Sequence, residues 1–237
     1  MDQITISAKN LGALALKSFC PRCFWLRMKC ENKLPYQIFP GIFSSIDSYT
    51  KKVTNLHHQK LSVVPKWLSG FGELDRPVKV PHFSKYFIID PTTNVRLRGG
   101  PDEVIQRKDG SFVILDYKTA KYTGTQDELL PMYEVQLNAY AYIGDRTEFK
   151  PVSALGLIYY EPITDLTLDR IEEVLIDSGF NMGFRSNVHP IKLVPETIIP
   201  PLLKLVRDIC ESAKAPDRLS GCKDCAALEH LIEFATS

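Results

Sequence analysis

The sequence has no long hydrophobic run and no basic leader. No window of about 18 residues is apolar throughout, which argues against a membrane-spanning helix. The first five residues, Met1 to Thr5, contain no basic residue, and the apolar stretch Leu11 to Leu16 is too short for the core of a secretion signal. We therefore expect a cytoplasmic protein with no membrane partner.

Excess charge, internal repeats and low-complexity tracts are also missing. The 29 basic and 28 acidic residues give a net charge of +1, which argues against tight nucleic-acid binding over the whole surface. Basic residues can still be concentrated around one groove. With 237 residues, 44% of them hydrophobic, the chain is long enough to bury a full core, and we expect a single domain over residues 1–237.

The stretch from Gly99 to Thr119 carries the strongest local signal. It reads GGPDEVIQRKDGSFVILDYKT, and its middle contains the pair Asp109-Gly110, which is typical of a hairpin turn. The apolar run from Phe112 to Tyr117 follows the turn and predicts a strand. This pattern indicates a β-hairpin.

The two strands of this hairpin place charged side chains together. Side chains two apart on a strand share a face, so Asp116 and Lys118 point one way while Leu115 and Tyr117 point the other. Pairing the hairpin back from its turn brings Asp102 to the same end of the sheet. Two carboxylates and one ammonium are therefore expected to converge.

This set of groups suits metal-assisted cleavage of a phosphodiester. Carboxylate oxygens are the ligands that Mg²⁺ or Mn²⁺ prefers, and the bound metal polarises the phosphate and acidifies a water. A lysine can orient that water or stabilise charge that develops on the phosphate. An Asp-x-Lys sequence alone is usually just the solvated end of a strand, but the order of all three groups favours a functional site.

Two motifs resemble a known family. Pro101-Asp102 followed by Asp116-x-Lys118 resembles the core of the PD-(D/E)XK nuclease superfamily. Further on, Gln136-Leu-Asn-Ala-Tyr140 resembles the Q-x-x-x-Y motif of its RecB-like exonuclease branch, which includes CRISPR-associated nucleases. The resemblance implies an α/β fold with a restriction-endonuclease-like core, in which a mixed β-sheet is flanked by helices.

The resemblance also implies roles for these residues. Asp102, Asp116 and the backbone carbonyl of Tyr117 would hold Mg²⁺ or Mn²⁺, and Lys118 would activate or orient water. Gln136 would position nucleic acid or a metal-bound water, with support from Tyr140 on the same helical face. Alternatively, Tyr140 is an ordinary core residue and Gln136 lies at the edge of the core.

A further metal ligand is expected on a predicted helix from Gly41 to Lys60. RecB-like nucleases often carry a histidine there, and the matching place in this chain holds Asp47, which is chemically acceptable for a hard divalent ion. An exposed helix acid is an equally good interpretation. His57 and His58 are less well placed, and surface positions suit them better.

Six cysteines occur, and four of them form two C-x-x-C pairs. Cys20, Cys23, Cys222 and Cys225 suit tetrahedral Zn²⁺ or an iron–sulfur cluster, and this site would join the N- and C-terminal helices in an element formed by residues 19–30 and 210–230. The alternative is a set of reduced, partly buried thiols.

The cysteine pattern departs from the family. The run CPRCFWL from Cys20 to Leu26 resembles the N-terminal cysteine element of RecB-like nucleases that carry a metal cluster. Those enzymes typically use one N-terminal and three C-terminal cysteines, but Leu231 stands near the expected place of the last thiol. We expect Cys30 and Cys210 to be unliganded.

The remaining pattern predicts further elements. Arg96 and Arg98 alternate on one strand face and suit either phosphate contact or solvent. The other predicted elements are helices over Ala8–Leu16 (capped by Ser7), Glu128–Ile143 and Glu196–Ala213, and strands over Pro77–Pro81, Lys85–Ile89, Ser153–Tyr160, Ile163–Leu168 (as the partner of the preceding strand) and Val188–Val194.

The sequence thus predicts a metal-dependent nuclease that hydrolyses DNA, either single-stranded or at ends, with possible protein partners in a repair, recombination or CRISPR complex. Two alternatives remain. The chain could be a catalytically inactive nucleic-acid-binding or assembly subunit that retains the nuclease fold, or a zinc- or cluster-bearing interaction module with an incidental Asp-x-Lys.

Overall fold

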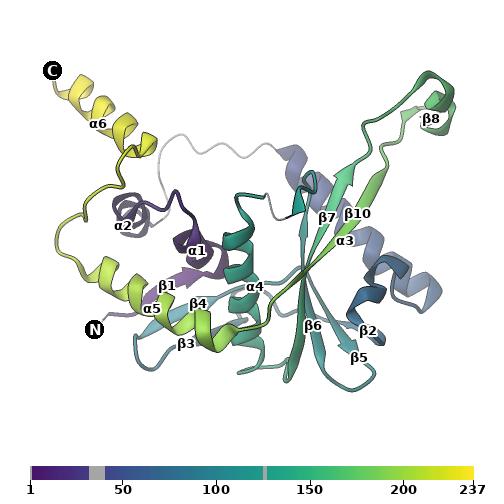
Figure 1. Cartoon of the computed structure of the whole chain (residues 1–237), viewed down its shortest axis with the longest axis horizontal. Helices are drawn as coiled ribbons and strands as arrows, with labels where there is room; N and C mark the ends of the chain where they lie inside the picture. Colours follow the sequence, from purple (N-terminus) through teal and green to yellow (C-terminus); the bar gives the residue numbers. More distant parts are fainter. Residues whose placement is uncertain (1, 32–40, 125–126) are drawn as a thin grey trace.

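A five-stranded mixed sheet forms the centre of the molecule (Figure 1). The computed structural model describes residues 2–31, 41–124 and 127–237. The strand order is β10-β7-β6-β5-β2, with β6 and β7 parallel and the other neighbours antiparallel. These strands are β2 (Leu74–Val78), β5 (Glu103–Arg107), β6 (Phe112–Lys118), β7 (Val152–Pro162) and β10 (Phe184–Ile191). The predicted mixed sheet is confirmed.

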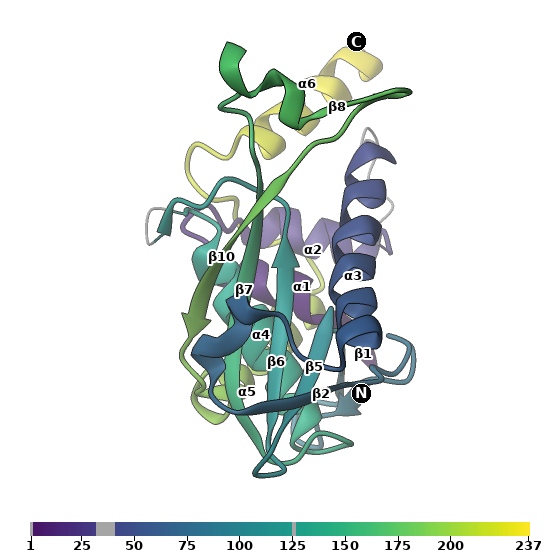
Figure 2. The same cartoon turned by 90° about the vertical axis from the view of Figure 1, so that its right-hand side faces the viewer.

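Helices cover both faces of this sheet (Figure 2). The helix α4 (Leu130–Gly144) packs on the face that carries Ile114 and Leu157, as part of the larger core. The helix α3 (Gly41–Leu61) and the short 3-10 helix η2 (Lys66–Phe71) lie on the other face. The alternation of buried side chains along β6 therefore serves two cores, as expected for a central strand.

A smaller sheet and the terminal elements complete the fold. This sheet has the order β1-β4-β3, and its strands are β1 (Ile4–Ser7), β3 (Phe87–Ile89) and β4 (Val95–Arg98). The remaining helices are α1 (Ala8–Gly12), η1 (Ala13–Ala15), α2 (Pro21–Lys29), η4 (Leu168–Glu173), α5 (Pro195–Glu211) and α6 (Lys223–Thr236). The predicted N-cap is confirmed, because Ser7 Oγ accepts a hydrogen bond from Asn10 N at 3.2 Å. None of the described helices is long and apolar enough to cross a membrane.

The prediction for the segment after β7 was wrong. Ile163–Leu168 does not return along β7; the partner is β10, which pairs with it from Phe184–Pro162 to Ile191–Leu155. Residues 163–183 extend outward from the sheet and are called here the arm (Figure 1). The arm reverses at a small hairpin of β8 (Leu175–Ile176) and β9 (Gly179–Phe180). Pro162 still pairs with Phe184, so the two strands separate only beyond it, and the chain reverses where Gly179 adopts a φ of 148°.

Candidate active site and cysteine cluster

The hairpin of β5 and β6 has the register that its turn predicts. Gly110 adopts a φ of 86°, and Asp109 Oδ1 accepts a hydrogen bond from Ser111 N at 2.9 Å, which closes the turn. Glu103 then pairs with Leu115, so that Asp102 comes to lie beside the end of β6.

Asp102 is fixed by the backbone of the neighbouring strand. Its Oδ2 accepts a hydrogen bond from Tyr117 N at 2.7 Å. The chain reaches this position through Gly99, which packs against the ring of Tyr140; a Cβ at Gly99 would lie 2.6 Å from two ring carbons. Glycine is therefore required at position 99 by the close approach to α4.

Asp116, Lys118, Gln136 and Tyr140 form one connected group. Lys118 Nζ lies 2.5 Å from Asp116 Oδ2 as an ion pair without hydrogen-bond alignment, and 3.4 Å from Gln136 Oε1. Gln136 Nε2 donates to Asp116 Oδ1 at 3.2 Å and to the Tyr140 hydroxyl at 2.7 Å. The predicted common face of Gln136 and Tyr140 is present, and α4 holds both against the carboxylate.

Burial controls the charge of these acids. It raises the pKa of Asp116 to about 6, although the neighbouring Lys118 ammonium acts to lower it. Burial also raises the pKa of Asp102, against the attraction of Lys51. Carboxyl groups with raised pKa values beside lysines, at the end of a strand, are typical of functional sites.

Asp47 reaches this group only through a lysine that the sequence analysis missed. Lys51 Nζ lies 2.8 Å from Asp47 Oδ2 and 2.8 Å from Asp102 Oδ1. The signal was in the sequence: Asp47, Thr50, Lys51 and Thr54 follow the i, i+3, i+4, i+7 spacing of one helical face. We call Asp47, Lys51, Asp102, Asp116 and Lys118 the acid cluster.

The helix α3 turns this polar face inward. Thr50 and Thr54 are its buried residues, and Thr54 Oγ1 hydrogen-bonds the Tyr160 hydroxyl at 3.1 Å across to the sheet. The apolar residues of α3 face outward instead; Tyr49 is 57% exposed and Leu56 59% exposed. The polar face therefore positions the acid cluster, whereas the apolar face remains at the surface.

The predicted alternatives to Asp47 lie elsewhere. His57 Nδ1 contacts the Val63 carbonyl at 3.3 Å, and its ring packs against Trp67. His58 follows Asp47 by eleven residues, about 16 Å along the helix axis at 1.5 Å per residue. The structure therefore brings Asp47, rather than either histidine, to the acid cluster.

Glu103 is a second ionisable group that the sequence analysis did not single out. It is 5% exposed, and neither of its carboxyl oxygens has a hydrogen-bond partner among the described residues. Burial, and then the charge of Asp102, raise the pKa of Glu103 to about 7. It pairs with Leu115 and points to the opposite face of the sheet from Asp116, since side chains alternate along each strand.

Arg96 and Arg98 lie in the smaller sheet and face aromatic rings. The Arg96 guanidinium stacks 3.9 Å from the centroid of Phe87, and that of Arg98 lies 5.6 Å from the centroid of Phe83. Arg96 also donates to the Ser84 carbonyl at 3.2 Å. Both arginines are only partly exposed, so they are ordered against their own sheet rather than fully solvated.

The four predicted cysteines meet in space and are called here the cysteine cluster. Their Sγ atoms all lie within 4.8 Å of one another, and this is the one group of three or more potential His, Cys, Asp or Glu ligands at that spacing in the described part of the chain. Cys23 Sγ lies 3.6 Å from Cys222 Sγ and 3.3 Å from Cys225 Sγ, while Cys20 Sγ lies 3.7 Å from Cys225 Sγ. Cys30 and Cys210 lie outside this group.

The surroundings of the cysteine cluster join the two ends of the chain. Arg22 forms an ion pair with Glu229 at 2.9 Å, and Trp25 Nε1 donates to the Ser212 carbonyl at 3.1 Å. Leu219 N donates to Cys20 Sγ at 3.3 Å. Burial acts to raise the pKa of Cys20, but backbone and thiol hydrogen bonds together lower that pKa to about 6, whereas burial raises the pKa of Cys23 and of Cys225. A thiolate at Cys20 is suited to bind a metal.

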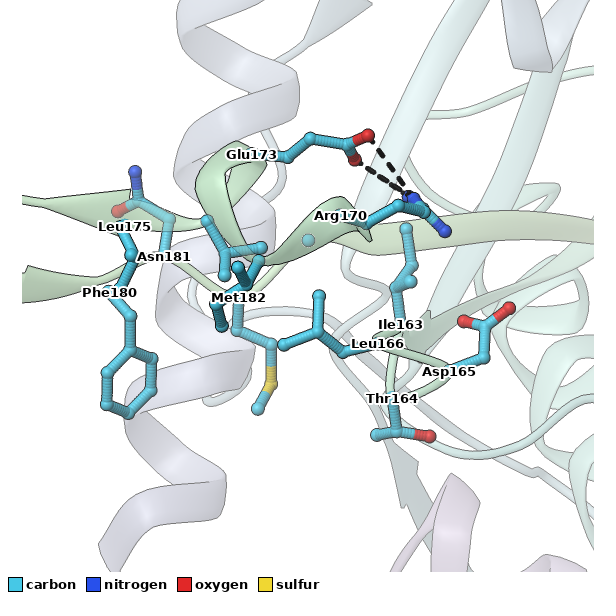
Figure 3. A pocket seen from close by; sticks show the side chains of 13 residues that line it. Ile163, Thr164, Asp165, Leu166, Arg170, Glu173, Leu175, Phe180, Asn181 and Met182 are labelled. Carbon is cyan, nitrogen blue, oxygen red and sulfur yellow. Dashed lines mark hydrogen bonds and ion pairs between the residues drawn. The ribbon is translucent and has the colours of Figure 1, made fainter. Parts of the chain in front are cut away.

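A cavity of about 650 Å³ lies in the arm (Figure 3). Leu166, Phe180 and Met182 contribute apolar side chains to it, and Arg170 pairs with Glu173 at its rim at 2.9 Å. None of the predicted site residues lines this cavity.

Similarity to known proteins identifies the superfamily of the chain. Among solved structures, the chain is similar to the one titled "Crystal structure of SSO0001", with 16% sequence identity, a TM-score of 0.38, and coverage of 91% of this chain and 80% of that chain. No curated protein matches the sequence. The family model of the PD-(D/E)XK nuclease superfamily matches residues 39–229, and the chain therefore belongs to that superfamily.

Proposed function

We propose that this chain is a metal-dependent deoxyribonuclease of the RecB-like exonuclease type. The observation that carries the proposal is the placement of Asp102 beside β6, at the end where Asp116 and Lys118 share one face. The domain is proposed to span residues 1–237, with the cysteine cluster as an element formed by residues 19–30 and 210–230.

The donor atoms suit a hard divalent cation. Asp102, Asp116, Asp47 and the backbone carbonyl of Tyr117 offer only oxygen ligands, as Mg²⁺ and Mn²⁺ prefer. Bound there, either ion would supply polarisation of the scissile phosphate and an acidified water. The carboxylate of Asp102, just before β5, and that of Asp116, near the end of β6, would bind it from two adjacent parts of the sheet, a rigid base for such a site.

Lys118 and Gln136 would act on the reacting groups. The Lys118 ammonium would orient the attacking water or stabilise charge on the phosphate as the water oxygen bonds to phosphorus and the bond to a sugar oxygen breaks. Gln136, held by the Tyr140 hydroxyl, would position the nucleic acid. The single-stranded part or the end of DNA is the proposed substrate, and repair, recombination or CRISPR complexes are the proposed setting for protein partners.

A single Zn²⁺ is the proposed occupant of the cysteine cluster. Tetrahedral Zn²⁺ with Zn–S bonds of about 2.3 Å places its sulfur ligands about 3.8 Å apart. The Sγ separations of 3.3, 3.6 and 3.7 Å are close to that value. In a [4Fe–4S] cluster each thiolate binds a separate iron, so the cysteine sulfurs lie further apart than these separations.

Cleavage of end-labelled single- and double-stranded DNA with Mg²⁺ or Mn²⁺ tests the proposal. Wild type should release label in an EDTA-sensitive reaction, and both Asp116→Ala and Lys118→Ala should abolish it. Lys121→Ala, at an exposed lysine in the loop after β6, is the matched control and should cleave like wild type. Product lengths separate exonuclease from endonuclease action.

The second candidate is a catalytically inactive nucleic-acid-binding or assembly subunit. The net charge of +1 favours it, since the chain as a whole gains little from phosphate attraction. Absence of cleavage on every substrate, from protein with its cysteine-bound metal verified, would support this second function and overturn the first.

A further inference from the structure

Lys51 occupies the space between two acids that the proposed function assigns to a metal ion. Its ammonium contacts Asp47 Oδ2 and Asp102 Oδ1, each at 2.8 Å. The Asp47 contact is an ordinary i, i+4 helix pair, but the Asp102 contact joins α3 to the sheet hairpin. The second contact is therefore a tertiary one, made by a side chain on the inward face of α3.

The other carboxylate oxygens of Asp102 and Asp116 contact groups that are less free to move than Lys51. Asp102 Oδ2 accepts from the backbone N of Tyr117, and Asp116 Oδ1 accepts from Gln136 on α4. Asp116 Oδ2 pairs with Lys118. Of these partners, the Lys51 ammonium combines a long flexible stem with a side chain that is 34% exposed, whereas that of Lys118 is 17% exposed.

A cation that binds Asp102 Oδ1 and Asp47 Oδ2 would compete with the Lys51 ammonium, which contacts the same two oxygen atoms. Two positive groups cannot share these oxygens without strong repulsion. The three carboxylates and two ammonium groups of the acid cluster sum to −1 when all are ionised, and a divalent ion changes that sum to +1. The added charge favours release of the exposed ammonium and attracts an anion.

We propose that Lys51 is a second substrate-binding lysine, which a divalent cation displaces from Asp47 and Asp102 and which then pairs with a phosphate of the nucleic acid. The proposal rests on the proposed function and deepens it. Before displacement, Lys51 keeps Asp47 and Asp102 from repelling each other. After displacement, the ammonium lies on the rim of the acid cluster, on the helix that borders the end of the sheet.

Titration with Mn²⁺, followed by the loss of the free-ion electron paramagnetic resonance signal, tests the exchange without any need for cleavage. Lys51→Met should bind Mn²⁺ about tenfold more tightly than wild type, because the competing charge is gone. Lys51→Arg keeps the charge and should stay closer to wild type. Lys52→Met, at the exposed neighbouring lysine, should not change the affinity. Thermal melting verifies that each variant is folded.

Binding of a short single-stranded oligonucleotide, with Ca²⁺ in place of Mg²⁺, tests whether the displaced Lys51 pairs with a phosphate. Lys51→Met should bind the oligonucleotide about tenfold more weakly in the loaded protein, whereas Lys52→Met should change the affinity less. Unchanged or weaker Mn²⁺ binding by Lys51→Met, or unchanged oligonucleotide binding, would overturn the proposal. A protein that cleaves no DNA but shows the Mn²⁺ difference would overturn the nuclease function while supporting the exchange.

Discussion

The acid cluster and the cysteine cluster are the two groups proposed to bind metal ions, but the chain supports them differently. In the acid cluster, hydrogen bonds and ion pairs connect Asp102, Asp116 and Lys118 to the sheet and α4. Lys51 connects Asp102 to Asp47 on α3. The cysteine thiols mainly contact one another, and α6 beyond them is largely exposed.

This difference indicates which region depends on its ligand for structure. The acid cluster stands on strands whose side chains are buried in two cores, so its geometry follows from the fold. The cysteine cluster joins segments about 200 residues apart, and among the described residues after Cys210 the one that is buried is Cys225. A metal ion bound by the four cysteines would then supply much of the energy that holds those segments together. The two regions should therefore respond in opposite ways to loss of their ligands.

The largest expected effect is on cleavage by Asp116→Asn. Loss of this carboxylate should lower the cleavage rate by about 10³-fold, since it removes a charged metal ligand worth several kcal/mol in the transition state. The melting temperature should not fall, because the variant also removes a carboxylate that is buried at a cost. Rates on end-labelled DNA, thermal melting and the content of cysteine-bound metal measure this; loss of that metal would contradict the separation of the two regions.

The double variant Cys20→Ser with Cys225→Ser should lower stability while changing cleavage little, the reverse of Asp116→Asn. The bound metal should be lost and the free energy of unfolding should fall by on the order of 4 kcal/mol, because the ends of the chain lose their clamp. Cleavage should change far less than in Asp116→Asn while the protein is folded.

Metal analysis and absorption spectra of the same proteins measure the cysteine-bound ion. Wild type should contain one zinc per chain without the visible absorption of an iron–sulfur cluster. Cys30→Ser is the control, because Cys30 is exposed and lies outside the cluster. Equal stability of the double variant and wild type would show that the cysteine cluster is not a clamp.

Gly99→Ala tests whether the acid cluster depends on packing. The new Cβ would meet the ring of Tyr140 at 2.6 Å, and overpacking of this kind costs about 1–3 kcal/mol. Displacement of Tyr140 would also move Gln136, so cleavage should slow. Gly70→Ala is the matched control, since a Cβ at Gly70 meets nothing within 4 Å. Equal melting temperatures for the two variants would contradict the assigned role of Gly99.

Local patterns predicted the parts of the site that lie close together in sequence. The turn at Asp109-Gly110 and the period of two along β6 were sufficient to place Asp102 beside Asp116 and Lys118. The two C-x-x-C pairs likewise predicted which cysteines meet. These inferences needed only the geometry of one hairpin and the spacing of metal ligands.

Apart from the meeting of the two C-x-x-C pairs, contacts between distant elements could not be predicted in this way. Lys51 was missed because its partner Asp102 is on another element, and the docking of α3 on the sheet is not encoded in the helix itself. The pairing of β7 with β10 was missed because two strands separated by the arm leave no local turn signal. Only the inward polar face of α3 gave a usable hint, since a helix that buries threonines needs polar partners.

The smallest expected effect concerns Glu103, which follows Asp102 in the chain and points to the opposite face of the sheet from Asp116. Its pKa is raised to about 7, so burial of the ionised carboxylate costs stability as the pH rises from the ordinary value of 4.5, and the cost is complete above pH 7. Glu103→Gln removes the charge and should raise the free energy of unfolding by about 1–3 kcal/mol above pH 7, with the gain vanishing below the ordinary pKa. Melting curves in EDTA across this pH range measure it. A gain that does not depend on pH would contradict the raised pKa of Glu103, because the cost of its ionisation would then be absent from the folded protein.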